Sequence, residues 1–176
     1  MNIANKVTMV RMFLVPVFVI LYLILGEKYN IAALVFVIAS LTDALDGHLA
    51  RSRNLVTTFG KFLDPLVDKI LTMAAFILLA EANIVAGWAV IIIIARELII
   101  TGFRTIAQSQ NITIAASIYG KAKTMTQCVA IVMLLLNINW PLHLDLIVFY
   151  LAVILTILSG VDYLLKNKKV LDLENI

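Results

Sequence analysis

Apolar runs of about twenty residues recur along the chain, and they constrain its fold more than any other feature. As a helix, a run of this length matches the roughly 30 Å hydrocarbon core of a bilayer. The composition agrees, since 62% of the residues are hydrophobic, 14% are charged and the mean hydropathy is +1.03. Soluble domains are about 45–50% apolar and about 25% charged. The chain is therefore expected to be an all-α integral membrane protein.

The positions of the apolar runs predict a six-helix polytopic protein. The predicted helices cover about 8–26, 30–52, 60–82, 84–108, 117–138 and 143–166. Short connections between them predict that successive helices are antiparallel neighbours. A basic start precedes the first run, but no small-residue cleavage site follows it, so a retained first helix is expected. No stretch has the composition of a soluble domain, so residues 1–176 are expected to form a single membrane domain.

The basic residues predict the orientation of these helices. Lys and Arg concentrate in cytoplasmic loops of membrane proteins. With six spans, 13 of the 14 basic residues fall on one side, and Lys28 alone falls on the other. Trp88 and Trp140 then mark the opposite membrane interface, where aromatic rings are enriched. Both termini are therefore predicted to be cytoplasmic.

Four aspartates occur in the segment DALDGHLARSRNLVTTFGKFLDPLVDK, which runs from residue 43 to residue 69. They are Asp43, Asp46, Asp64 and Asp68. An ionised Asp at the centre of a membrane helix costs about 2.5–3.5 kcal/mol on insertion scales. Four such groups are expected only where they face a hydrated cavity and are neutralised by counter-charge.

The spacing of the aspartates predicts that they converge. Asp43 and Asp46 are three residues apart, and Asp64 and Asp68 are four apart, so each pair shares one helix face. Hard carboxylate oxygens favour Mg²⁺ or Mn²⁺ over Zn²⁺. Two divalent ions would balance four carboxylates and would suit a phosphoryl displacement. The sequence therefore predicts a two-metal phosphotransfer site.

The same segment resembles the signature of the CDP-alcohol phosphotransferase family. Asp43-Ala44-Leu45-Asp46-Gly47-His48-Leu49-Ala50-Arg51 is followed by eight residues, Gly60, three residues, Asp64, three residues and Asp68. All eight fixed positions of the family signature agree, and six helices match the family fold. The flanking stretches NKVTMVRMFLVPVF and ARELIITGFR are most similar to those of bacterial phosphatidylglycerophosphate synthases.

The resemblance implies transfer of the phosphatidyl group of CDP-diacylglycerol to sn-glycerol 3-phosphate, with release of CMP. It implies that the four aspartates hold the metals and that Asp68 is also the general base. It further implies that Asp46, Gly47, Ala50 and Arg51 bind the nucleotide part of the CDP-lipid. We also assign Gly60 to that site, where a glycine allows close approach to backbone. Asn5 and Thr8 recur on one face of the first helix, and Asn5 is either a helix cap or a nucleotide ligand.

The acceptor carries a dianionic phosphate, so its pocket is expected to contain cations. The candidates are Arg104, Lys121 and Lys123 at the cytoplasmic helix ends, Lys61 close to the predicted metal site, and Arg96. The alternative for these residues is topology signalling and contact with lipid headgroups. Arg96 is deeper in its helix, and it is either an acceptor ligand or part of a buried pair. Glu97 points about 100° away from Arg96, so the two are not expected to pair simply.

Other functions and partners stay open at this point. Relatives with the same motif use serine, inositol phosphate or phosphatidylglycerol as acceptors. A cation transporter is a different possibility, because intramembrane carboxylates often mark ion pathways. The resemblance also implies a homodimer. We expect membrane lipids but no nucleic acid as partners, and a multi-pass location in the cytoplasmic membrane of a bacterium with the active site facing the cytoplasm.

Overall fold

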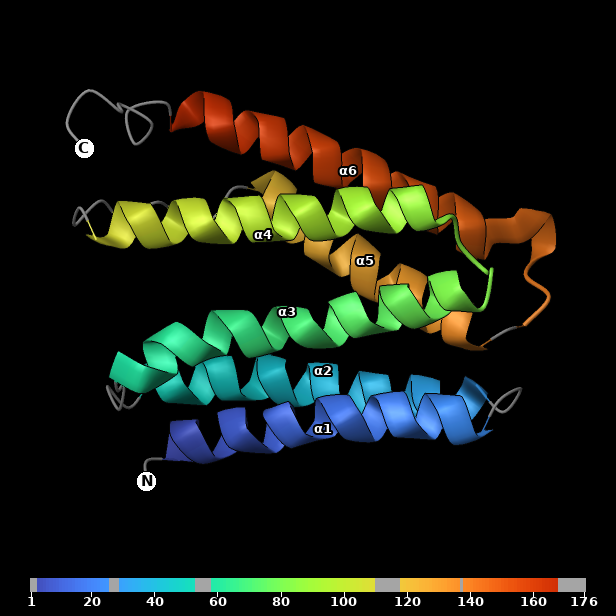
Figure 1. Ribbon diagram of the computed structural model, residues 1–176, viewed down its shortest axis with the longest axis horizontal. Helices are drawn as coiled ribbons and strands as arrows, with labels where there is room; N and C mark the ends of the chain where they lie inside the picture. Colours follow the sequence, from blue (N-terminus) through green and yellow to red (C-terminus); the bar gives the residue numbers. More distant parts are fainter. Residues whose placement is uncertain (1–2, 26–28, 53–57, 110–117, 137, 168–176) are drawn as a thin grey trace. The chain divides into compact units, whose positions relative to one another are not determined.

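The computed structural model is helical throughout the part of the chain that it describes. It describes residues 3–25, 29–52, 58–109, 118–136 and 138–167, and the side chains of 12–25, 30–41, 69–107, 118–136 and 138–167. The helices are α1 (Ile3–Leu25), α2 (Tyr29–Ser52), α3 (Thr58–Glu81), α4 (Gly87–Ser109), α5 (Ile118–Leu136), the short 3-10 helix η1 (Pro141–His143) and α6 (Leu144–Lys166) (Figure 1). No strand occurs in these ranges. The predicted all-α fold with six α-helices is confirmed for them.

The chain forms two compact units. The first comprises Met1–Ile84 and Ile131–Asn139, and the second comprises Val85–Ala130 and Trp140–Ile176. In the first unit, α1 packs against both α2 and α3 (Figure 1). In the second unit, α4 packs against α6.

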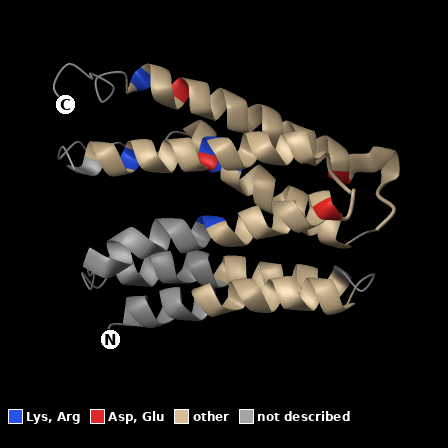
Figure 2. Ribbon diagram, viewed as in Figure 1, with Lys and Arg blue, Asp and Glu red and all other residues tan. Residues whose placement is uncertain are grey.

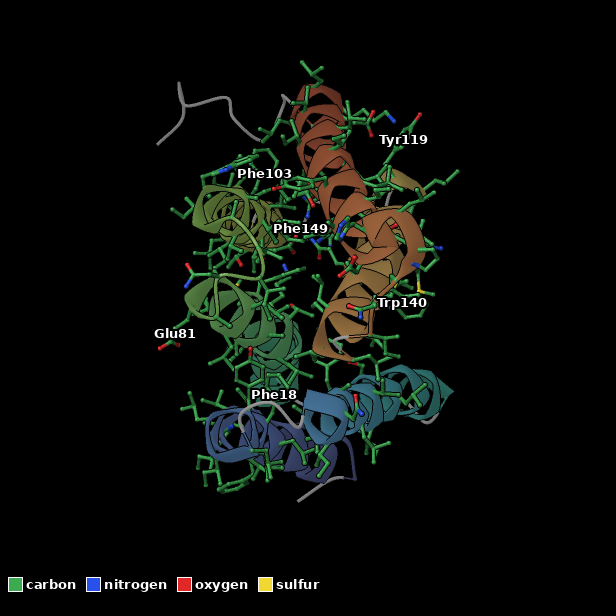
Figure 3. The ribbon with its side chains drawn as sticks, turned by 90° about the vertical axis from the view of Figure 1, so that its right-hand side faces the viewer. Phe18, Glu81, Phe103, Tyr119, Trp140 and Phe149 are labelled. Carbon is green, nitrogen blue, oxygen red and sulfur yellow. The ribbon has the colours of Figure 1, made fainter. Side chains whose placement is uncertain are left out.

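Aromatic side chains form much of the interior of the first unit. Phe18 of α1 is fully buried, and its ring centroid lies 6.0 Å from that of Phe36 of α2 (Figure 3). The Tyr22 hydroxyl donates a hydrogen bond to the Leu78 carbonyl of α3 at 3.5 Å. Offset aromatic pairs at such distances add about 0.5–1.5 kcal/mol to the gain from burial. These contacts connect α1 to the two helices that carry the four aspartates.

A Schellman motif ends α3. The backbone N–H of Asn83 donates to the Ala80 carbonyl and that of Ile84 to the Leu79 carbonyl, each at 3.0 Å. Asn83 has φ 57°, the left-handed conformation that this motif requires and that asparagine tolerates. The motif stops the helix and allows the chain to begin α4 at Gly87.

A stripe of buried residues along α6 forms one side of the second unit. The stripe consists of Phe149, Ala152, Val153, Thr156, Ser159, Gly160 and Tyr163. Its small members allow neighbouring helices to approach closely, as at interfaces between membrane helices. The charged residues of α6 are restricted to Asp145, Asp162 and Lys166, near its two ends (Figure 2).

The hydropathy of α6 is that of a membrane span. Among the described residues, the helical stretch Pro141–Lys166 is long and apolar enough to cross a bilayer, with a mean hydropathy of 2.4. Two shorter apolar stretches lie at Met12–Leu25 and Asn30–Leu41. This finding applies to the described residues, which leave out parts of α1, α2 and α3.

Candidate functional site

A cluster of polar side chains lies inside the second unit, and Glu97 of α4 is at its centre. Glu97 is 5% exposed. Its Oε1 atom accepts a hydrogen bond from Nζ of Lys123 on α5 and a second, at 3.2 Å, from a terminal nitrogen (NH1) of Arg96. The Lys123 side chain is 4% exposed. Two predicted phosphate-binding residues, Arg96 and Lys123, are thus brought together on one carboxylate oxygen.

The Arg96–Glu97 contact corrects our prediction that these neighbours do not pair. Their side chains leave α4 about 100° apart. The arginine side chain is long enough to turn back toward the carboxylate, where it forms an ion pair at 3.2 Å. Arg96 is therefore part of an ion pair, with its side chain 14% exposed, and its role as an acceptor ligand stays a prediction.

Helix α6 fixes the other end of the Arg96 guanidinium. The second terminal nitrogen (NH2) of Arg96 donates to Oγ of Ser159 at 3.0 Å. The next residue is Gly160, where an added Cβ would lie 3.1 Å from Cγ of Arg96. Real Cβ atoms rarely approach this closely, so Gly160 leaves the space through which the arginine chain passes.

A neutral hydrogen bond connects α5 and α6 next to this cluster. Nε2 of Gln127 donates to Oγ1 of Thr156 at 3.0 Å, and both residues are buried. The Thr156 hydroxyl donates in turn to the Ala152 carbonyl. Gln127 is one helical turn from Lys123, so the polar contacts follow one face of α5.

Burying these charges makes their pairing energetically important. Removing one partner of a buried ion pair costs about 3–5 kcal/mol, because the other charge is left uncompensated. Within the described residues, Nε of Arg96 has no hydrogen-bond partner. Ionisable groups inside membrane helices are functional candidates by default.

Arg104 lies farther along α4, against an aromatic ring. Its Cζ atom is 5.5 Å from the centroid of the Tyr163 ring, a cation–π distance. The Tyr163 ring is buried and contacts Phe103 edge-on at 5.8 Å (Figure 3). Tyr163 therefore limits where the exposed Arg104 guanidinium can lie.

Most of the predicted site residues lie outside the described side chains. Lys121 is described and exposed, unlike the buried Lys123. The bounds of α2 include positions 43–51 and those of α3 include positions 60–68, so the motif positions on either side of the link are helical. The predicted residues whose side chains are outside the description are Asn5, Thr8, Asp43, Asp46, Gly47, Ala50, Arg51, Gly60, Lys61, Asp64 and Asp68.

The donor chemistry of the two helices fits a hard divalent metal. Four carboxylates at helical spacing supply the oxygen ligands that Mg²⁺ and Mn²⁺ prefer. The described side chains contain no group of three or more His, Cys, Asp or Glu that could hold a metal ion, and the four aspartates are not among them.

Three contacts of the second unit involve residues that were not predicted from the sequence. These four residues are Ser159, Thr156, Gln127 and Tyr163. A signal for them exists, since Gln127 follows Lys123 by four residues, and Thr156 and Ser159 interrupt an apolar helix three residues apart. Polar side chains in such helices usually face the interior of the bundle.

Comparisons with known proteins identify the family. A family model described as CDP-alcohol phosphatidyltransferase matches residues 1–158. The chain is 40% identical over 192 aligned residues to a CDP-diacylglycerol–glycerol-3-phosphate 3-phosphatidyltransferase of Bacillus subtilis, with 99% of each chain covered. It is 38% identical to a probable phosphatidylglycerophosphate synthase of Mycobacterium tuberculosis H37Rv (92% of this chain and 79% of that one). It is 35% identical to a Rickettsia bellii protein with the same name as the Bacillus protein, with 96% of each covered. The chain therefore belongs to the CDP-alcohol phosphatidyltransferase family, and it is a phosphatidyltransferase enzyme.

Proposed function

We propose that this enzyme transfers the phosphatidyl group from CDP-diacylglycerol to sn-glycerol 3-phosphate, giving phosphatidylglycerophosphate and CMP. The observation that carries the proposal is similarity over nearly the full chain to relatives named for this reaction. The complete aspartate motif adds the chemistry that the reaction needs.

In the proposed mechanism, the acceptor hydroxyl attacks the β-phosphorus of the CDP-lipid in line. A bond forms between the hydroxyl oxygen and that phosphorus, and the bond from phosphorus to the bridging oxygen breaks. CMP leaves with the electron pair of the broken bond. Asp68 takes the proton of the attacking hydroxyl, as a general base within reach of it would.

Asp43, Asp46, Asp64 and Asp68 are proposed to hold the divalent metal on which members of this family generally depend. We propose two ions, Mg²⁺ or Mn²⁺. Ions bound there would stabilise negative charge on the attacking and leaving oxygens. The helical bounds of α2 and α3 support the proposal, because they give each aspartate pair the register that it requires.

The substrate sites are proposed on the helices that flank the motif. The proposed nucleotide ligands are Asn5, Thr8, Asp46, Gly47, Ala50, Arg51 and Gly60. The proposed acceptor-phosphate ligands are Lys61, Arg96, Arg104, Lys121 and Lys123. The charge of the described candidates supports the second group, because a dianionic phosphate binds best to several cationic donors.

We further propose a six-span topology with both termini in the cytoplasm, as a single domain over residues 1–176. The distribution of basic residues supports this orientation. The enzyme would lie in the cytoplasmic membrane of a bacterium and act as a homodimer. The active site would face the cytoplasm, where the polar acceptor is dissolved, and the bilayer would supply the lipid substrate.

An acceptor panel tests the function. Purified enzyme in detergent would receive CDP-diacylglycerol and Mg²⁺ with radiolabelled glycerol 3-phosphate, serine or inositol phosphate, or with labelled phosphatidylglycerol. We expect CMP release and a substantial new lipid product with glycerol 3-phosphate alone. A strong product with serine would change the acceptor while leaving the chemistry intact. No metal-dependent CMP release with any acceptor would contradict the proposal.

Replacing Arg104 with alanine is expected to raise the KM for glycerol 3-phosphate roughly ten- to hundredfold, with a smaller effect on kcat. A hydrogen bond to a charged group contributes about 1.5–3 kcal/mol, and it would be lost from the bound acceptor. Steady-state kinetics with varied acceptor checks this. Lys166→Ala is the control, since this exposed lysine pairs with Asp162. An unchanged KM in the Arg104 variant would place the phosphate elsewhere.

The Tyr163 ring is expected to contribute to the same binding step. Tyr163→Leu should raise the KM for glycerol 3-phosphate about two- to fivefold, because a cation–π contact is worth about 0.5–1 kcal/mol at exposed sites. Tyr163→Phe keeps the ring and removes a hydroxyl that has no partner among the described residues, so it should match the wild type. Equal KM values for the Leu and Phe variants would contradict a role of the ring.

A further inference from the structure

We infer that Glu97 is a positioning residue for acceptor binding: its carboxylate holds Lys123 and Arg96 side by side, as a preformed cationic pair for the acceptor phosphate. This inference rests on the proposed function. Glu97 itself carries the wrong charge to bind a phosphate, so it would act through the two cations.

The first argument for this inference comes from the contacts of the Glu97 Oε1 atom. Nζ of Lys123 and NH1 of Arg96 both donate to Oε1 of Glu97. Two donors on one oxygen must lie close to each other, although their positive charges repel. The carboxylate offsets that repulsion, and it joins groups that are 27 residues apart in sequence on two different helices. A phosphate with several terminal oxygens is recognised by such closely spaced cationic donors.

The second argument comes from the N–H donors of Arg96 that Glu97 and Ser159 do not use. An arginine guanidinium has five N–H donors. Glu97 and Ser159 each accept one hydrogen bond from a terminal nitrogen of Arg96, so each of those nitrogens keeps a second N–H. The Nε atom is buried and has no partner within the described residues. Two anchored ends fix the plane of the guanidinium while donors are left over for a ligand. Gly160 keeps open the space that this conformation occupies.

The neighbouring hydrogen bond between Gln127 and Thr156 is an example of an uncharged structural connection between helices of this unit. Gln127 and Thr156 connect α5 to α6 with both partners buried and no charge. A connection between α4 and α5 could be made in the same way. A buried lysine and a part-buried arginine on one buried carboxylate are energetically expensive by comparison, which favours a role in binding an anion.

The test compares Glu97→Gln, Glu97→Asp and Ser159→Ala with the wild-type enzyme in detergent. KM and kcat would be measured with glycerol 3-phosphate varied and then with CDP-diacylglycerol varied. Thr156→Val is the matched control, because it breaks the neutral bond between helices with little change in shape. Thermal melting of each variant reports its folding.

We expect Glu97→Gln to raise the KM for glycerol 3-phosphate about 10- to 100-fold, as for partners that orient metal-binding side chains. The KM for CDP-diacylglycerol should stay within about twofold. Glu97→Asp should recover part of the loss, because it restores the charge on a shorter chain. Ser159→Ala should raise the KM for glycerol 3-phosphate by a smaller factor. This variant provides the test if Glu97→Gln does not fold. Thr156→Val should lower the melting temperature and leave both KM values unchanged.

The inference would be overturned if the Glu97 and Ser159 variants behaved like Thr156→Val, with lower stability and unchanged KM values. That result would identify the cluster as a structural connection and leave the proposed function intact. A wild-type enzyme that makes no lipid from glycerol 3-phosphate would instead overturn the proposed function, and the inference with it.

Discussion

Asp68→Asn is expected to lower turnover by about 10²–10⁴-fold or more, to a rate near background. General base catalysis alone contributes a factor of this size. The amide has nearly the same shape as the carboxylate, but it cannot accept the hydroxyl proton and it is a weaker metal ligand. The measurement is CMP release from CDP-diacylglycerol at saturating glycerol 3-phosphate and Mg²⁺.

A matched substitution on α6 controls for the change of Asp to Asn. Asp162 forms an ion pair with Lys166 at 2.8 Å, with the lysine side chain 64% exposed. Such surface pairs contribute about 0–1 kcal/mol, so Asp162→Asn should retain full activity. Near-normal turnover in a folded Asp68→Asn variant would rule out its role as proton acceptor.

Removing divalent metal should have an equally large effect. With EDTA in excess, CMP release is expected to fall to background, because four ionised aspartates would then repel one another and no cation would stabilise the displaced oxygens. Adding Mg²⁺ or Mn²⁺ beyond the chelator should restore the rate. The rate of CMP release is measured after chelation and again after metal is added back.

EDTA already loaded with Mg²⁺ controls for effects of the chelator on the detergent and the lipid substrate. It should leave the rate unchanged. Full activity that persists in metal-free buffer would contradict the metal-dependent mechanism.

The fold could be predicted well from hydropathy, apart from the ends of the helices. An apolar run marks the part of a helix that lies in the hydrocarbon core of the bilayer, but the helix itself can extend beyond that core. The first helix was predicted from about residue 8, but α1 begins at Ile3, in a stretch where polar residues interrupt the apolar ones. The start of α4 was predicted at about residue 84, but residue 84 still belongs to the Schellman motif that ends α3, and α4 begins at Gly87.

Within the site, the sequence predicted which residues are candidates but not which of them contact one another, because those contacts depend on the tertiary structure. The sequence marked Arg96 and Lys123 as candidates, but only the structure shows that both donate to Glu97. The Arg96–Glu97 prediction was wrong because it used directions from the helix and ignored the length of the arginine side chain. Ser159 has no charge and is 63 residues from Arg96, so only the fold could reveal their contact. The roles of the four aspartates stay predictions, and family membership favours an enzyme over a cation transporter.

Manganese binding to the purified enzyme tests the central claim most directly. Electron paramagnetic resonance of a Mn²⁺ titration would count the ions and detect magnetic coupling between close neighbours. Our account predicts two ions per chain with a coupled signal, and loss of both when Asp43, Asp46, Asp64 and Asp68 are all replaced by Asn in a variant that still melts cooperatively. Absence of bound Mn²⁺ in the wild type, or the same two ions in the variant, would contradict it.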